Sequence, residues 1–248
     1  MAQKEDTTLT NLTQPENTYW HFLPKSRRLQ YGDGREVVAG ETLRVEGTPV
    51  LYEHGLHASA RAIDALIRRP GPIACLVTLG GEVVHDADKS AGQERTCLWM
   101  IDATHLLREF ACEVAWVALL REREAGREPY PRSWAAIKVT RRFLRGEASE
   151  AERKAAWTAA LAAADDADKS LNDEYLNFSA ASMAAYAAAY AAASTATYAA
   201  AYAAAWAADS AATLRFNAEA GAAATAEFNV RLTQMLLAAG QASQKEVA

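Results

Sequence analysis

Basic charge is in short supply in this chain of 248 residues. Lysine and arginine number 26 against 31 aspartates and glutamates, which gives a formal net charge of −5. A net-acidic protein does not attract the phosphate backbone of nucleic acids over long range, so we expect no nucleic-acid partner. Charged residues still make up only 23% of the chain and hydrophobic residues 50%, which excludes wholesale disorder.

Cysteine is scarce as well. Cys75, Cys97 and Cys112 form no Cys-x-x-Cys pair, and a bridge between any two would leave the third unpaired. This usage is typical of a reducing cytosol rather than of a disulfide framework. Residues 1–20 lack the apolar run of a secretory signal, so we expect a cytoplasmic protein.

Long runs of strongly apolar side chains are also missing. Residues 184–208 carry no charge, but they consist of alanine with tyrosine, tryptophan, serine and threonine. Without leucine, isoleucine, valine or phenylalanine, such a segment has little tendency to enter a bilayer. We therefore expect no membrane partner.

Proline and glycine nearly vanish from the second half. All 7 prolines lie before residue 132, and after residue 150 the only glycines are Gly221 and Gly240. Alanine, the strongest helix former, takes their place. The composition predicts a flexible N-terminus over residues 1–18 and an α+β domain over residues 19–147. An alanine-rich helical domain over residues 148–240 and a frayed tail over residues 241–248 follow, with Gly240 capping the last helix.

The first half has short apolar runs separated by turn residues, a pattern typical of a small sheet. Short apolar or β-branched runs at residues 36–38, 42–45 and 49–52 are separated by glycine, which favours a mostly antiparallel sheet. Residues 73–79 predict a core strand that Gly80 and Gly81 end. Helices are predicted over residues 59–69, with Ser59 as the N-cap, and over residues 102–124 and 134–144.

The second half predicts a helical hairpin or bundle. Residues 149–167 begin with Ser149 and Glu152 in the spacing of a capping box. Asp165, Asp166 and Asp168 crowd the end of this segment, where carboxylates oppose the helix dipole, so we expect a break there. From about residue 179 to residue 239 the chain is again predicted to be helical.

Aromatic residues recur every four positions in this half. The interaction candidates are Tyr186, Tyr190, Tyr198, Tyr202 and Trp206. Each step of four advances the ring by about 40° around a helix, so the stripe rotates by about 200° over its length. Either the helix bends or breaks near residues 194–197, or the rings contact different neighbours. If the stripe packs between chains, it is a self-association element. The other interpretation is a low-complexity expansion that has no packing role.

Two short motifs carry a family resemblance. Residues 55–59 read Gly-Leu-His-Ala-Ser, and residues 86–89 read Asp-Ala-Asp-Lys. With the strands and helix predicted between them, residues 20–105 resemble an uncharacterised domain of unknown function found in bacteriophage and bacterial proteins. The resemblance implies a phage or prophage origin and the cytoplasm of a host cell. It implies no activity.

The same motifs supply the candidate ligand-binding residues, which are His54, His57, Ser59, Asp86, Asp88 and Lys89. His57 and Ser59 stand at a predicted strand-to-helix junction, where backbone N–H groups can face an anion. The pair resembles the nucleotide-binding strand of ADP-ribosyltransferase-like folds. The structural interpretation is that His57 caps a turn and Ser59 caps the helix.

Metal and phosphate sites are weaker possibilities. His54, His57, His85 and Asp88 are ligand types that metals use, but three-residue spacing outside a helix does not bring two rings together. Asp86, Asp88 and Lys89 are equally consistent with a turn whose charges are solvated. We expect no metal and no cofactor.

These observations predict a non-catalytic binding or assembly protein. Its N-terminal domain would recognise a protein partner, and its helical half would mediate self-association into a homo-oligomer. A small-molecule ligand is compatible with the candidate residues. The alternative is a nucleotide-handling enzyme of the ADP-ribosyltransferase-like type that uses His57 and Ser59. The sequence does not decide whether the chain is an enzyme.

Overall fold

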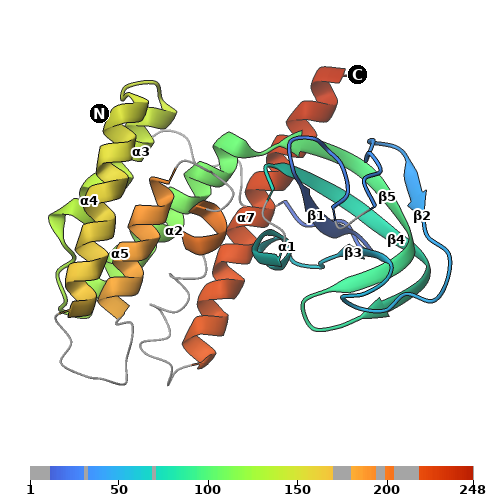
Figure 1. Ribbon diagram of the computed structural model, residues 1–248, viewed down its shortest axis with the longest axis horizontal. Helices are drawn as coiled ribbons and strands as arrows, with labels where there is room; N and C mark the ends of the chain where they lie inside the picture. Colours follow the sequence, from blue (N-terminus) through green and yellow to red (C-terminus); the bar gives the residue numbers. More distant parts are fainter. Residues whose placement is uncertain are drawn as a thin grey trace. The chain divides into compact units, whose positions relative to one another are not determined.

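A computed structural model describes residues 12–30, 33–68, 71–169, 180–193, 199–203 and 218–247. The chain divides into two compact units (Figure 1). Unit 1 comprises Met1–Ala103 and Asn229–Ala248, and unit 2 comprises Thr104–Phe228. The predicted fold class is confirmed: an α+β chain with an antiparallel sheet of five strands and alanine-rich helices.

Unit 1 contains the sheet. Its strands are β1 (Tyr19–Leu23), β2 (Thr42–Arg44), β3 (Leu56–Ala58), β4 (Ile73–His85) and β5 (Ser90–Asp102). The order is β1-β4-β5-β2, and β3 pairs with the start of β5. Ser59, just after β3, exchanges two backbone hydrogen bonds with Trp20 of β1, at 2.7 and 3.0 Å. The sheet therefore curls until its first strand meets the end of β3.

Strand β4 does not end at its two glycines, contrary to our prediction. The pairing of β4 with β5 shifts register between Gly80 and Val83, and Gly81 has a φ of +69°. A bulge of this kind bends a strand and leaves the pairing to continue beyond it. Strands β1 and β5 were not predicted, because neither shows a clean apolar alternation bounded by turn residues.

Helix α1 (Ala62–Arg68) begins three residues after Ser59, so the prediction that Ser59 is its N-cap is wrong. The backbone of Ser59 is used in the bridge to Trp20 instead. A side chain of another helix caps the start of α1: the buried Ile63 N–H donates to the side-chain oxygen of Asn229, at 3.1 Å.

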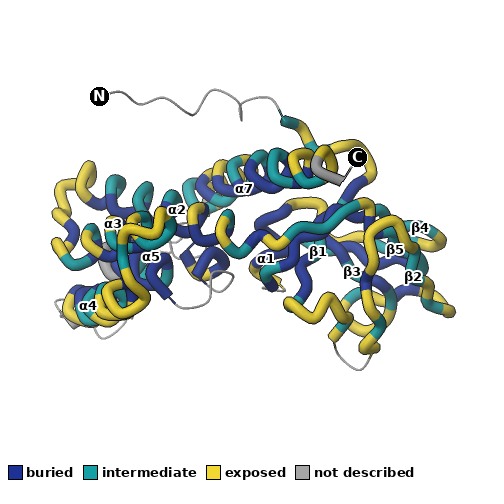
Figure 2. Tube along the Cα trace, turned by 90° about the horizontal axis from the view of Figure 1, so that it is seen from above, coloured by how far each residue is buried: buried dark blue, intermediate teal, exposed yellow. Residues whose placement is uncertain are grey.

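Asn229 lies on helix α7 (Ala218–Val247), whose residues from Asn229 onward belong to unit 1. Figure 2 shows buried and exposed positions alternating along α7, and Leu232 and Leu236 are fully buried. Gly240 faces the indole of Trp99 so closely that a Cβ there would lie 2.7 Å from Cζ2. The prediction of a C-cap at Gly240 with a frayed tail is therefore wrong. The glycine permits close packing, and the helix continues to Val247.

Unit 2 is a bundle built on small side chains. Its helices are α2 (Thr104–Glu124), α3 (Pro131–Leu144), α4 (Glu150–Lys169) and α5 (Ala180–Ala191). A buried cluster of Ala136, Ala160, Ala189 and Ala192 joins α3, α4 and the end of α5. Methyl side chains let helix axes approach closely, which is how an alanine-rich sequence forms a core.

Helix α4 begins with the predicted capping box, which is confirmed. Ser149 Oγ accepts the Glu152 N–H at 3.2 Å, and the Glu152 carboxylate accepts the Ser149 N–H at 2.7 Å. Helix α4 continues through Asp165, Asp166 and Asp168 and ends at Lys169, one residue beyond the aspartates at which a break is predicted. Two of the carboxylates have partners on neighbouring helices: Asp166 pairs with Arg132, and Asp165 accepts the hydroxyl of Tyr186 at 3.0 Å.

The tyrosine stripe folds back on itself. The rings of Tyr190 and Tyr202 stack with centroids 4.9 Å apart. Positions twelve residues apart on one straight helix would be separated by about 18 Å, so the two tyrosines do not share one. Helix α5 ends at Ala191, which agrees with the first of the two alternatives that the sequence left open, an interruption of the helix within the stripe. Tyr186 stacks on Tyr190, whereas Tyr198 and Trp206 lie outside the described residues.

The units divide the chain at residues 103/104 and 228/229, not near residue 147 as the composition predicts. Helices α2 and α3 belong with the alanine-rich helices, and residues 229–248 belong with the sheet. Packing explains the difference. Helix α2 buries Ala111, Ala115 and Ala118, which suit alanine-lined neighbours, whereas the end of α7 buries Leu232 and Leu236.

We predict that Gly240→Val destabilises unit 1 by about 2 kcal/mol, because the added methyl groups overlap the Trp99 indole. Thermal or urea unfolding of the full chain measures this change. The matched control is Gln241→Val, which places the same side chain at the exposed neighbouring position. Equal stability of the two variants would show that Gly240 is not a packing residue.

Candidate functional site

A tight loop in unit 1 places one tyrosine in an unusual conformation. Val50 and His54 exchange backbone hydrogen bonds of 2.8 and 2.9 Å, which closes the loop around Tyr52. Tyr52 has a φ of +70°, and 53% of its surface is exposed. A non-glycine residue in the left-handed region costs about 1–2 kcal/mol, so other contacts must maintain it.

His57 on β3 provides one such contact. Its ring Nε2 accepts the backbone N–H of Tyr52 at 3.1 Å. Only an unprotonated imidazole nitrogen can accept this bond, so the contact requires that Nε2 carry no proton. The ring of His57 is therefore used to hold the Tyr52 loop against the sheet.

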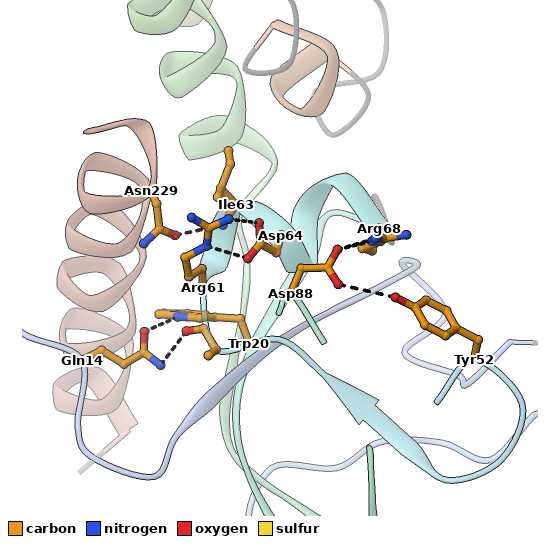
Figure 3. Close-up of polar contacts among 10 residues, drawn as sticks. Gln14, Trp20, Tyr52, Arg61, Ile63, Asp64, Arg68, Asp88 and Asn229 are labelled. Atoms are coloured by element: carbon orange, nitrogen blue, oxygen red, sulfur yellow. Dashed lines mark hydrogen bonds and ion pairs between the residues drawn. The ribbon is translucent and has the colours of Figure 1, made fainter. Parts of the chain in front are cut away.

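Two cations flank the Tyr52 ring. Lys89 Nζ lies 4.3 Å from the ring centroid, and the guanidinium carbon of Arg68 lies 5.7 Å from it. Asp88 joins the group by accepting Arg68 Nε at 2.7 Å and a second, short bond from Nη2, and its other oxygen lies 3.5 Å from the Tyr52 hydroxyl. Figure 3 shows the Asp88 carboxylate between Arg68 and Tyr52. We call these four residues, Tyr52, Arg68, Asp88 and Lys89, the Tyr52 surface.

Helix α1, which carries Arg68, is held at its other end by a second set of contacts. Arg61 donates to Asp64 through two bonds of 2.6 and 2.7 Å, and Asn229 accepts the Ile63 amide (Figure 3). Gln14 accepts the indole N–H of Trp20 at 2.7 Å, and this bond fixes the segment that enters β1. These contacts fix the position of the helix that carries Arg68.

Arg95 on β5 holds the opposite side of the site. It is only 4% exposed, and its Nη1 donates to the backbone carbonyl of His57 at 2.7 Å and lies 3.3 Å from His21 Nδ1. Burial lowers the pKa of the Arg95 guanidinium to about 10. Within the described part of the chain it forms no ion pair, and its Nη2 has no hydrogen-bond partner. Asp33, whose negative charge favours the charged guanidinium of Arg95, is itself paired with Arg35 at 2.7 Å.

The structure brings together half of the predicted ligand-binding residues. His57, Asp88 and Lys89 converge on Tyr52. Ser59 does not reach them, because it is buried where β3 meets β1.

His54 and Asp86 also lie apart from the cluster. His54 Nε2 lies 2.6 Å from the Glu46 carbonyl oxygen. Asp86 accepts the Ala87 amide in the β4–β5 turn, at 2.7 Å. His85, weighed with them as a metal ligand, stacks on Tyr19 and lies 2.9 Å from Ser90 Oγ.

Sequence reasoning missed Tyr52 and Arg68. Nothing local marks Tyr52 for a positive φ, since glycine, asparagine and aspartate are the usual residues there. Arg68 stands in the last turn of α1, where a basic residue is explained by the helix dipole alone. Only the curl of the sheet, which brings the β4–β5 turn beside α1, places Asp88 and Lys89 next to both.

A comparison with protein-family models, with curated proteins and with solved structures found no match for this chain. The described helices include none with the length and hydropathy that a membrane span needs. Over the same residues, no three histidine, cysteine or carboxylate side chains gather in the manner of metal ligands.

The positive φ of Tyr52 predicts that substitutions at this position differ in stability according to how well they tolerate it. Tyr52→Gly and Tyr52→Val both delete the ring, but only glycine adopts a φ of +70° without strain. We expect the glycine variant to be more stable than the valine variant by at least about 1 kcal/mol in urea unfolding. At Arg44 in β2 the order should reverse, because glycine weakens a strand. A valine variant at position 52 as stable as the glycine variant would contradict the assigned strain.

Proposed function

We propose that the chain is a non-catalytic binding protein whose unit 1 recognises a partner protein through the Tyr52 surface. The observation that carries the proposal is a half-exposed aromatic ring held in a strained conformation between two cations. Strained residues persist where surrounding contacts over-determine them, and they cluster at ligand-contacting sites.

The chemistry of the surface favours a protein partner. Tyrosine and arginine dominate the binding energy of protein interfaces, because each combines a large contact area with directional polar groups. Val50, two residues before Tyr52, is 44% exposed and adds apolar area. Arg68 and Lys89 outnumber Asp88, so the partner surface should be apolar at its centre and acidic at its rim.

Immobilised full-length protein tests this proposal with extracts of bacterial cells. We expect one or more proteins to be retained by the wild type and by Val38→Ala, a control that trims another exposed apolar side chain. The same proteins should be lost with Tyr52→Ala and with Arg68→Gln, each of which removes part of the Tyr52 surface. Identical sets of retained proteins for all four chains would exclude the Tyr52 surface as the site.

The choice of a bacterial extract rests on the family resemblance of residues 55–59 and 86–89. We propose a bacterial or phage origin and a cytoplasmic location on that basis. The three cysteines, all buried and free, support a reducing compartment.

Self-association of the helical half stays part of the proposal. Tyr190 and Tyr202 stack within one chain, so this pair is already partly used inside the fold. Among the described tyrosines of the stripe, Tyr202 is the most exposed, at 44%, so its exposed part is where we place the contact with a second chain. We predict that the mass from light scattering rises with concentration, and that Tyr202→Ser weakens the rise. A monomer mass at all concentrations would remove self-association.

The alternative enzyme function stays a prediction. A nucleotide that contacts both His57 and Ser59 would have to displace the Tyr52 amide from the His57 ring and reach a serine that is only 3% exposed. The described contacts therefore favour recognition over nucleotide chemistry at this site.

A further inference from the structure

Unit 2 carries a second group of aromatic and cationic side chains, on helices α2 and α3. The indoles of Trp116 and Trp134 meet edge to face, with centroids 4.8 Å apart. The guanidinium of Arg141 lies over the Trp116 ring at 4.9 Å, and that of Arg123 lies over the Trp134 ring at 5.5 Å. We call these four residues the Arg–Trp ladder.

The ladder arginines differ from the other surface arginines of unit 2. Most of those arginines pair with carboxylates: Arg121 with Glu227, Arg127 with Glu122, Arg132 with Asp166, Arg142 with Glu152 and Arg145 with Glu147. Among the residues that the structure describes, Arg123 and Arg141 have no carboxylate within ion-pair distance. Their guanidinium groups lie over aromatic rings, which carry no net charge and therefore do not neutralise them.

Helical spacing adds a third cation to the same face. Lys138 lies four residues after Trp134 and three before Arg141 on α3, and it is exposed. Residues at these separations are neighbours on a helix surface. The face therefore presents three positive charges against one negative charge, that of Glu113 three residues before Trp116 on α2, around two half-buried indoles. Its positive excess contrasts with the formal net charge of −5 of the chain.

A guanidinium stacked on an aromatic ring keeps its edge N–H donors available. Those donors can bind a carboxylate in a bidentate manner, and the ring fixes the plane in which they lie. We propose that the Arg–Trp ladder is a docking surface for an acidic segment of a partner protein, whose carboxylates bind Arg123 and Arg141. The ladder residues all belong to unit 2, whereas the Tyr52 surface belongs to unit 1.

The same geometry disfavours a single-stranded nucleic acid. Proteins that bind single strands stack bases on open aromatic faces. Here a guanidinium covers one face of each indole, and the two indoles contact each other. Carboxylate binding needs only the guanidinium edges, so an acidic peptide fits this arrangement better than a stacked base.

A labelled synthetic peptide of alternating glutamate and leucine is the probe, titrated against the full chain by fluorescence anisotropy. We expect saturable binding that weakens with added salt and changes tryptophan emission. Arg123→Gln combined with Arg141→Gln should weaken binding by at least about tenfold, equivalent to about 1.4 kcal/mol. The matched control, Arg132→Gln with Arg145→Gln, changes the net charge equally at arginines that already have carboxylate partners.

A second pair of variants separates the ladder from simple charge and from misfolding. Arg123→Lys with Arg141→Lys keeps both charges but loses the planar fork, so binding should again weaken while the thermal midpoint is retained. Absence of peptide binding by the wild type, or equal losses in the ladder and control variants, would overturn the proposal. Tighter binding of a single-stranded oligothymidylate, lost with the ladder arginines, would overturn it in favour of a nucleic-acid surface.

Discussion

A buried arginine without a carboxylate partner ties the sheet of unit 1 to its candidate site. Arg95 projects from β5 and donates to the main-chain carbonyl of His57, so the guanidinium links strand β5 to the backbone of β3. A buried cation is costly to keep, and a hydrogen bond to a backbone carbonyl offsets that cost only where the acceptor is held in place. This contact acts together with the β3–β5 pairing and the Ser59–Trp20 hydrogen bonds to fix the position of β3, and with it the His57 ring.

His57 in turn positions Tyr52 at the surface of unit 1. The ring holds the amide of Tyr52, and the Tyr52 side chain lies among groups from α1 and from the β4–β5 turn. Three segments far apart in sequence thus meet at one exposed aromatic ring. Helix α7 packs on the elements that form this site: Asn229 caps the start of α1, and Gly240 lets the helix pack directly on Trp99 of β5. The C-terminal residues are therefore part of the domain that carries the site.

Part of this architecture can be predicted from the sequence. The fold class, the capping box at Ser149 and the interruption of the tyrosine stripe follow from propensity and helical geometry, which are local properties. The domain boundary, the role of Gly240 and the continuation of β4 through Gly81 do not, because each depends on what packs against the residue. The same division applies to the site: the motif residues His57, Asp88 and Lys89 were identified, whereas Tyr52 and Arg68 acquire their role only from the tertiary fold. Ser59 was misassigned because a serine between a short strand and a helix suits either role, and the sequence does not show that its backbone pairs with Trp20.

Amide hydrogen exchange of Arg95→Met tests the central claim most directly. Methionine fills a similar volume without the charge, so global stability should change little while the tie to His57 is lost. We predict faster exchange at β3, residues 56–58, and at Tyr52, with unchanged protection where β1 pairs with β4. Unchanged protection at both β3 and Tyr52 would contradict the account, because the site would then be held in place without the buried arginine.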